Sequence, residues 1–139
     1  MAGAPPANPQ RQTKAPTASL SADRLTDRVS KKVALVFPGQ GAQAVGMGKD
    51  LAAASPEAAA LFGQADEILG WSLSRICWEG PEEELTKTSV CQPALYVHGL
   101  AALAVVRARL GDFPVAGCAG LSLGEFTAHA AAGTFDFAT

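Results

Sequence analysis

One serine stands between two glycines in a pattern that supports nucleophilic chemistry. Ser122 lies in "GLSLG", from Gly120 to Gly124, after a short apolar run and before a helix-forming run. A G-x-S-x-G pattern between a strand and a helix is typical of a nucleophile elbow, a strained turn that lifts the hydroxyl above a sheet edge. The following helix would direct its positive end and the N–H of Leu123 toward a developing oxyanion. A simpler alternative is that Ser122 only caps that helix.

A second glycine-rich segment carries polar side chains that could join the serine. "GQGAQA", from Gly39 to Ala44, follows the apolar run Val33–Phe37. Gln40 comes directly after that run, so it reaches Ser122 only if the two predicted strands are neighbours. The same letters match a dinucleotide-binding fingerprint, which requires a second strand ending in an acidic residue about twenty residues later. The sequence there, "SPEAAALFGQADEIL", is typical of a helix, which argues against a dinucleotide site.

The elements that must hold these residues alternate between strands and helices. Apolar runs at Val33–Phe37 and Val115–Leu121 predict two strands, the first of them buried. Helical patterns occur, in order, at residues 56–69, in the acidic turn "PEEEL", in the apolar stretch "SVCQPALYVHGLAALAVVRARLG" and at residues 123–132, which Gly133 ends. This order predicts an α/β protein with a parallel sheet core.

Helix boundaries follow from capping residues. Ser55, Pro56 and Glu57 predict the start of the first helix, and Gly70 predicts its end. Its apolar face should contain Leu61, Phe62, Ala65, Ile68 and Leu69. Ser89 and Gln92 have the spacing of a capping box, so the long apolar helix should begin there. It is apolar nearly all round, so it should lie buried.

Composition narrows the classes of function. The chain has 139 residues, a formal charge of −2 and 48% hydrophobic residues, which gives no reason to expect nucleic acid or an anionic membrane as a partner. The longest apolar run is interrupted by His98 and Gly99 and falls short of the roughly 18 residues of a membrane helix. The three cysteines form no C-x-x-C pair and are expected to be buried, reduced thiols: Cys77, Cys91 and Cys118. No metal site is predicted, and a cytoplasmic location is expected.

The first thirty residues differ from the rest. They are rich in Pro, Ala, Ser and Thr and poor in large apolar residues, so residues 1–30 are expected to form a disordered extension. They have no apolar core of a secretory signal, whereas their basic start leaves an organelle transit peptide open as an alternative.

Three segments in register resemble the acyltransferase family of fatty-acid and polyketide synthesis, the malonyl-CoA:acyl carrier protein transacylases. They are "FPGQGAQAVGMGKDL", "CWEGPEEELTKTSVCQPAL" and "AGLSLGEFTAHAAAGTFDF". The resemblance implies that residues 31–139 form the N-terminal part of the catalytic domain, in an α/β-hydrolase-like large subdomain. It implies that Ser122 is the nucleophile, that Gln40 lies against the oxyanion beside the N–H of Leu123, and that Gln92 lines the same pocket.

The resemblance also implies a reaction. Ser122 would accept a malonyl group from malonyl-CoA and pass it to the phosphopantetheine thiol of acyl carrier protein. Coenzyme A enters as part of the substrate, and no resident cofactor is implied. A serine hydrolase such as a thioesterase and a non-catalytic, truncated acyltransferase fragment are the alternatives.

The sequence departs from the family in two ways. Leu121 stands where the family usually has histidine before the nucleophile, which affects the polarity of the pocket and the acyl preference. Family members are also roughly twice as long. Their second half supplies the general-base histidine, the arginine that pairs with the malonyl carboxylate and most of a ferredoxin-like subdomain, which is therefore expected to be absent here.

Neither histidine of the chain is a good replacement for the missing base. His129 is two helical turns from Ser122, or about 10 Å along the axis, whereas a base must come within about 3 Å. His98 is expected to be a core residue, and Glu125 a structural carboxylate in the first turn of its helix. We therefore expect the isolated chain to be inactive and to expose apolar surface beside its two strands.

Overall fold

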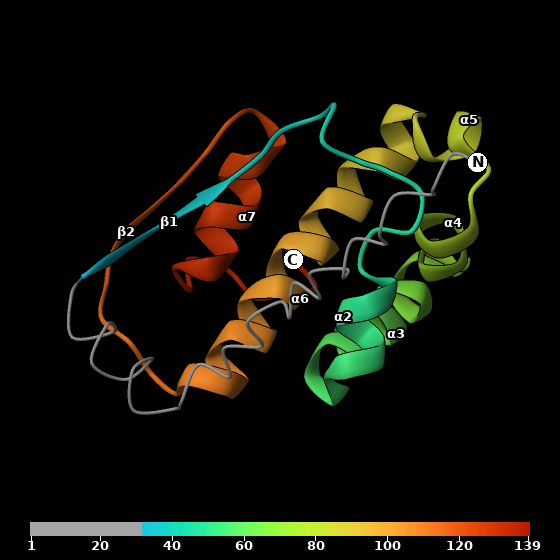
Figure 1. Cartoon of the computed structure of the whole chain (residues 1–139). Coiled ribbons are helices and arrows are strands. Elements are labelled where there is room, and N and C mark those ends of the chain that lie inside the picture. The colour runs from blue at the N-terminus through green and yellow to red at the C-terminus, as the bar shows by residue number, and fades with distance from the viewer. Residues whose placement is uncertain (1–31) are drawn as a thin grey trace, which may run out of the picture.

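The computed structural model describes residues 32–139, so the expected disorder of residues 1–30 lies outside the described part. One long helix, α6 (Thr88–Leu110), runs through the middle of the fold. Figure 1 shows the strands β1 (Val33–Phe37) and β2 (Val115–Gly120) with helix α7 (Leu123–Ala131) on one side of it. The shorter helices lie on the other side: α2 (Lys49–Ala54), α3 (Pro56–Leu69), α4 (Leu73–Glu79) and α5 (Glu82–Leu85).

The two strands pair in parallel, as the sequence predicts. Val33 lies opposite Val115 and Phe37 lies opposite Gly120, with one irregularity in register after Val33. The N–H of Leu121 donates to the carbonyl of Phe37 at 3.2 Å, which extends the pairing to the turn before Ser122. The carboxyl ends of both strands therefore meet at one edge of the sheet, and the α/β class with a parallel sheet is confirmed.

The prediction that Val33–Phe37 is a buried strand is wrong. Its residues alternate in exposure, Phe37 is the buried one, and the side chain of Val36 is 75% exposed. The physical reason is that the described part of the sheet has two strands, with α6 and α7 on one side of them, so alternate side chains point to solvent. Val115 is also exposed, which confirms that apolar surface is exposed at both strands.

Helix α3 begins and ends where its caps predict. The Ser55 side chain accepts from the N–H of Ala58 at 3.4 Å, and Gly70 closes the helix in the left-handed conformation, with φ of 72°. Phe62 and Ala65 are buried on its inner face as expected, whereas Ile68 is 51% exposed. The buried face of α3 contains Ala58, Phe62 and Ala65, and Ile68 lies at the flank of that face. The prediction that Ile68 belongs to the buried face is therefore wrong.

Helix α6 begins earlier than the expected capping box. The carbonyl of Lys87 accepts the N–H groups of Val90 and Cys91 at 2.9 and 2.8 Å, so Thr88 is the first helical residue and Lys87 occupies the cap position. Ser89 therefore lies inside the first turn, and the predicted cap at Ser89 is wrong.

The expectation that the apolar run of α6 falls short of a membrane helix is wrong. By length and composition alone it could cross a membrane, with a mean hydropathy of 1.5 in a window that is half buried. His98 and Gly99 do not interrupt it, and Arg107 and Arg109 lie in its last turn. In this fold α6 is the central core helix, because α3 and α7 contact it from two sides.

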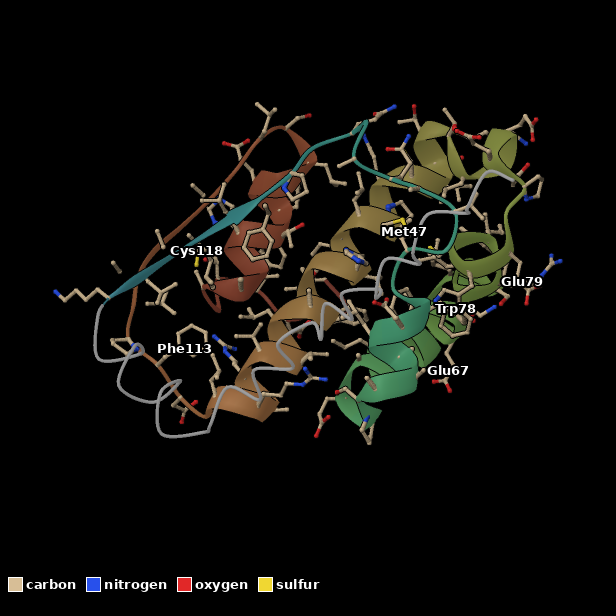
Figure 2. All side chains as sticks on the ribbon, viewed as in Figure 1. Met47, Glu67, Trp78, Glu79, Phe113 and Cys118 are labelled. Carbon is tan, nitrogen blue, oxygen red and sulfur yellow. The ribbon has the colours of Figure 1, made fainter. Side chains whose placement is uncertain are left out.

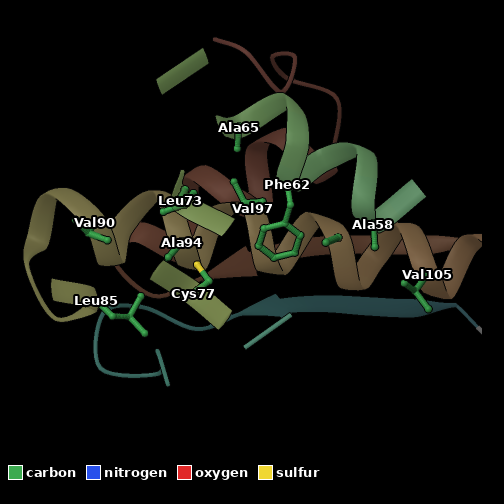
Figure 3. Close-up of a cluster of buried hydrophobic side chains, with 11 residues drawn as sticks. Ala58, Phe62, Ala65, Leu73, Cys77, Leu85, Val90, Ala94, Val97 and Val105 are labelled. Carbon is green, nitrogen blue, oxygen red and sulfur yellow. The ribbon is translucent and has the colours of Figure 1, made fainter. Parts of the chain in front are cut away.

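The hydrophobic core lies between α6 and the short helices. Figure 3 shows its side chains, which come from α3, α4, α5 and α6. The aromatic ring of Phe62 is 1% exposed and lies 5.5 Å from the ring of Trp78. Helices α2 and α4 were not predicted. Helix α4 depends on contacts from α3, because Asp66 accepts from the N–H and the hydroxyl of Ser74 at 2.9 and 2.6 Å.

Candidate functional site

Ser122 occupies a strained turn between β2 and α7. Its φ and ψ are 53° and −115°, and it is the one non-glycine residue with positive φ in the described part of the chain. Such backbone angles cost free energy and are concentrated at functional sites. The strand, the sharp turn and the helix occur in the order that a nucleophile elbow requires. The observed turn thus has the conformation that the G-x-S-x-G pattern predicts.

The glycines around Ser122 are required by close backbone approach. A Cβ on Gly120 would overlap the main chain of Gly124, and a Cβ on Gly124 would overlap the carbonyl oxygen of Phe37. A Cβ on Gly39 would lie 2.5 Å from the carbonyl oxygen of Leu121. The end of β1 and the serine turn are therefore in direct main-chain contact, which no other residue type at these three positions would permit.

The Ser122 side chain does not cap α7. Ser122 occupies the cap position before α7, but its side chain accepts no hydrogen bond from the helix and is exposed. The alternative in which the serine serves only as a helix cap is therefore wrong for this conformation. As the first residue of α7, Leu123 carries an N–H that has no carbonyl partner within the helix, so it stays available as a donor.

Of the predicted pocket residues, Gln92 and Leu123 line the same pocket, whereas Gln40 does not line it. Gln92 and Leu123 line one pocket of about 310 Å³, together with Pro93, Tyr96, Phe126, Phe135, Phe137 and Thr139. Gln40 lies at the same sheet edge as Ser122, three residues after β1. Its side-chain amide donates to the hydroxyl of Thr88 at 3.4 Å. The contact of Gln40 with an oxyanion at Ser122 stays a prediction.

Both histidines have surroundings that differ from those of a base beside Ser122. The Nδ1 atom of His129 lies 3.4 Å from the hydroxyl of Thr134, at the far end of α7. His98 is half-buried on α6, and burial lowers the pKa of its imidazole, against the smaller opposing effect of Asp50. A Cβ on Gly48 would lie 3.3 Å from the His98 ring, which places this histidine toward α2.

The cysteines do not provide a competing nucleophile in the core. Burial, with a smaller contribution from the charge of Asp66, raises the pKa of the Cys77 thiol to about 12. Burial also raises the pKa of the Cys91 thiol. Both thiols therefore stay protonated at neutral pH, and the thiolate is the reactive form. Cys118 is half-buried on β2, so the expectation of burial is wrong for that residue, and Figure 2 shows it far from Met47 and Trp78 in the helical layer.

Two features of the site were missed by sequence reasoning. Thr88, the hydrogen-bond partner of Gln40, lies 48 residues away, and no local pattern connects them. The aromatic wall of the pocket comes partly from Phe126, whose position on α7 places it at the surface with 61% exposure. Within residues 32–139, no group of three His, Cys, Asp or Glu side chains gathers in a way that could hold a metal ion.

Comparison with known proteins identifies the family. The acyl transferase domain family matches residues 34–138, which is nearly the whole of the described part. The chain belongs to this family. Among its relatives, the malonyl CoA-acyl carrier protein transacylase of Synechocystis is 49% identical over 108 residues, which are 78% of this chain and 36% of that protein. The protein of the same name from Escherichia coli K12 is 46% identical over 105 residues, 76% of this chain and 34% of that protein.

Solved acyltransferase structures share the fold. A type II PKS acyl-carrier protein in complex with its malonyl-transacylase matches with a TM-score of 0.72 and 42% identity, over 78% of this chain and 35% of that chain. The transacylase of Coxiella burnetii matches with a TM-score of 0.75 and 36% identity, over 79% and 34%. The matched part of the chain thus spans about a third of the length of these relatives. Since 108 residues are 36% of the Synechocystis protein, that protein has about 300 residues, roughly twice the 139 residues of this chain, as the resemblance implied.

Proposed function

We propose that the chain carries the nucleophile of a malonyl-CoA:acyl carrier protein transacylase. The observation that carries this proposal is the conformation of Ser122, whose strained turn meets the end of β1 through glycine contacts. Family membership supports the reaction class, and the names of the relatives indicate malonyl-CoA and acyl carrier protein as the expected substrates. A cytoplasmic location stays a prediction.

The proposed reaction has two acyl transfers. The Ser122 hydroxyl attacks the thioester carbonyl of malonyl-CoA, an ester forms at Oγ, and the coenzyme A thiol leaves with a proton. The phosphopantetheine thiol of the carrier protein then attacks that ester, which restores the Ser122 hydroxyl. Thioesters suit this route because a thiolate is a good leaving group, and the route requires no resident cofactor.

The oxyanion of each step would be held by N–H donors at the sheet edge. The N–H of Leu123, the residue after the nucleophile, is the first of them. The second would come from Gln40, because elbow enzymes take their second donor from a loop after a neighbouring strand. Gln92 would line the entry to this position from α6.

Activation of Ser122 requires a base that this part of the fold does not place beside it. His129 contacts Thr134, and His98 faces α2. Within the described residues 32–139, neither histidine forms a hydrogen bond with Ser122. We propose that the base and the group that binds the malonyl carboxylate come from the remaining two thirds of an acyltransferase domain. Leu121 is 75% exposed beside the nucleophile and would present an apolar group to the incoming acyl chain.

A fusion protein tests this function. It joins the full 139-residue chain to the part of the Escherichia coli relative that follows the matched segment, and the assay follows malonyl transfer from malonyl-CoA to holo-acyl carrier protein. We expect transfer by the fusion protein, none by its Ser122→Ala variant, and unchanged transfer by Ser89→Ala, which removes another exposed serine. Release of free malonate without malonyl carrier protein would instead indicate a hydrolase.

A further inference from the structure

The side chain of Gln40 is held by the start of the central helix. Its Nε2 atom donates to Oγ1 of Thr88 at 3.4 Å, across 48 residues of sequence. The loop that carries Gln40 has its own supports, since the N–H of Gly41 donates to the Gln43 side chain at 2.8 Å and the N–H of Gly46 donates to the carbonyl of Cys77 at 2.8 Å. These bonds fix the loop after Gln40, so the hydroxyl of Thr88 is left to orient the Gln40 side chain itself.

Thr88 also lies on the face of α6 that borders the proposed site. Residues four apart on a helix lie on the same face, and Thr88 is four residues before Gln92. Gln92 lines the pocket that Leu123 of the serine turn also lines. The same face of the first turns of α6 therefore carries both Gln92, which lines the pocket, and Thr88, which accepts a hydrogen bond from Gln40.

We propose that Thr88 is a positioning residue, which holds Gln40 in the orientation that serves the oxyanion at Ser122; this inference rests on the proposed function. A side-chain amide nitrogen carries two N–H donors, and Thr88 accepts from one of them. The second N–H and the main-chain N–H of Gln40 stay available. Holding a donor in place before the reaction is what makes an oxyanion site effective, because no reorientation is then required as charge develops.

The exposure of the two side chains distinguishes a positioning role of Thr88 from a role in folding. Gln40 and Thr88 are both exposed, so water competes for their hydrogen bond and its contribution to folding is small. Removing the Thr88 hydroxyl should therefore leave thermal unfolding nearly unchanged while it affects the reaction. Thr86 provides the matched control, because it is an exposed threonine whose hydroxyl donates to the carbonyl of Glu82 at 2.7 Å.

The first test is a double-mutant cycle in the fusion protein. We expect Thr88→Val to lower kcat for malonyl transfer by about fivefold with little change in KM, and Thr88→Ser to restore it. Thr86→Val should leave kcat unchanged. In a Gln40→Ala background, Thr88→Val should have no further effect, because the hydroxyl acts through Gln40. Additive losses from the two substitutions, or wild-type kcat in Thr88→Val, would overturn the proposal.

The second test does not depend on activity. In the 139-residue chain, nuclear Overhauser contacts are expected between the side-chain amide protons of Gln40 and the methyl group of Thr88, and they should persist in Thr86→Val. Absence of these contacts would overturn the assignment of Thr88. A folded wild-type fusion protein without any transfer would instead overturn the proposed function, while the Overhauser contacts would still decide whether Thr88 holds Gln40.

Discussion

The two sides of α6 differ in how completely their apolar side chains are buried. On the side of the short helices, Phe62, Leu73 and Cys77 are at most 1% exposed, and they form one continuous cluster. On the side of the strands, Val36 and Leu121 are 75% exposed and Phe126 is 61% exposed. The helical side is thus a closed core, whereas the strand side presents apolar groups to solvent around the serine turn.

This difference shows that stability and chemistry are supported by different interactions. The helical side is held by burial of large side chains, which is the dominant favourable term in folding. The serine turn is held by main-chain contacts at Gly39, Gly120 and Gly124, where there is no side chain to bury. Its geometry therefore depends on the absence of Cβ atoms, and its surface is exposed to solvent.

The largest effect should come from the closed core. Phe62→Ala should lower the free energy of unfolding of the 139-residue chain by about 4 kcal/mol, because it leaves a cavity beside Trp78. Ile68→Ala, on the exposed flank of the same helix, should change it by less than about 0.5 kcal/mol. Denaturant unfolding measures both. Equal losses from the two variants would contradict the division between core and surface.

A smaller but still large effect is expected at the serine turn. Gly124→Ala should cost about 3 kcal/mol, since its Cβ would overlap the carbonyl oxygens of Phe37 and Pro38 unless the backbone moves. The matched control is Gly63→Ala in α3, where nothing lies within 4 Å of the added Cβ. That variant should gain about 0.5–1 kcal/mol from helix propensity. If Gly124→Ala were as harmless as the control, the close contact between β1 and α7 would be incorrect.

The smallest effect is expected on the open face of the strands. Val36→Thr should change the free energy of unfolding by less than about 0.5 kcal/mol, because its side chain already meets water. Val97→Thr, the same substitution at a residue that is 2% exposed on α6, should cost about 2 kcal/mol through the buried hydroxyl. A similar cost at both positions would show that the strand face is covered in solution.

The serine turn was predictable because its determinants are local. Gly120, Ser122 and Gly124 lie within five residues, and the strand and helix beside them follow from short apolar and helical patterns. The parallel pairing of β1 and β2 followed from the alternation of strands and helices. These features require no knowledge of contacts distant in sequence.

The features that the sequence did not predict depend on distant contacts. Exposure of Val36 depends on what covers the sheet, which the strand pattern alone does not encode. Helix α4 relies on Asp66 of α3 as the acceptor for Ser74, and the hydrogen bond of Gln40 to Thr88 joins a loop to a helix. The start of α6 was misplaced because Lys87 supplies the capping carbonyl without any recognisable side-chain signal.

The central claim is that the strained residue Ser122 is the nucleophile of an acyl transfer. The most direct measurement is to incubate the fusion protein with malonyl-CoA, stop the reaction in acid and locate the malonyl group by peptide mass spectrometry. We expect one malonyl ester, on Ser122, that disappears when holo-acyl carrier protein is added before the acid. A malonyl group on any other residue, or one that persists in Ser122→Ala, would contradict it.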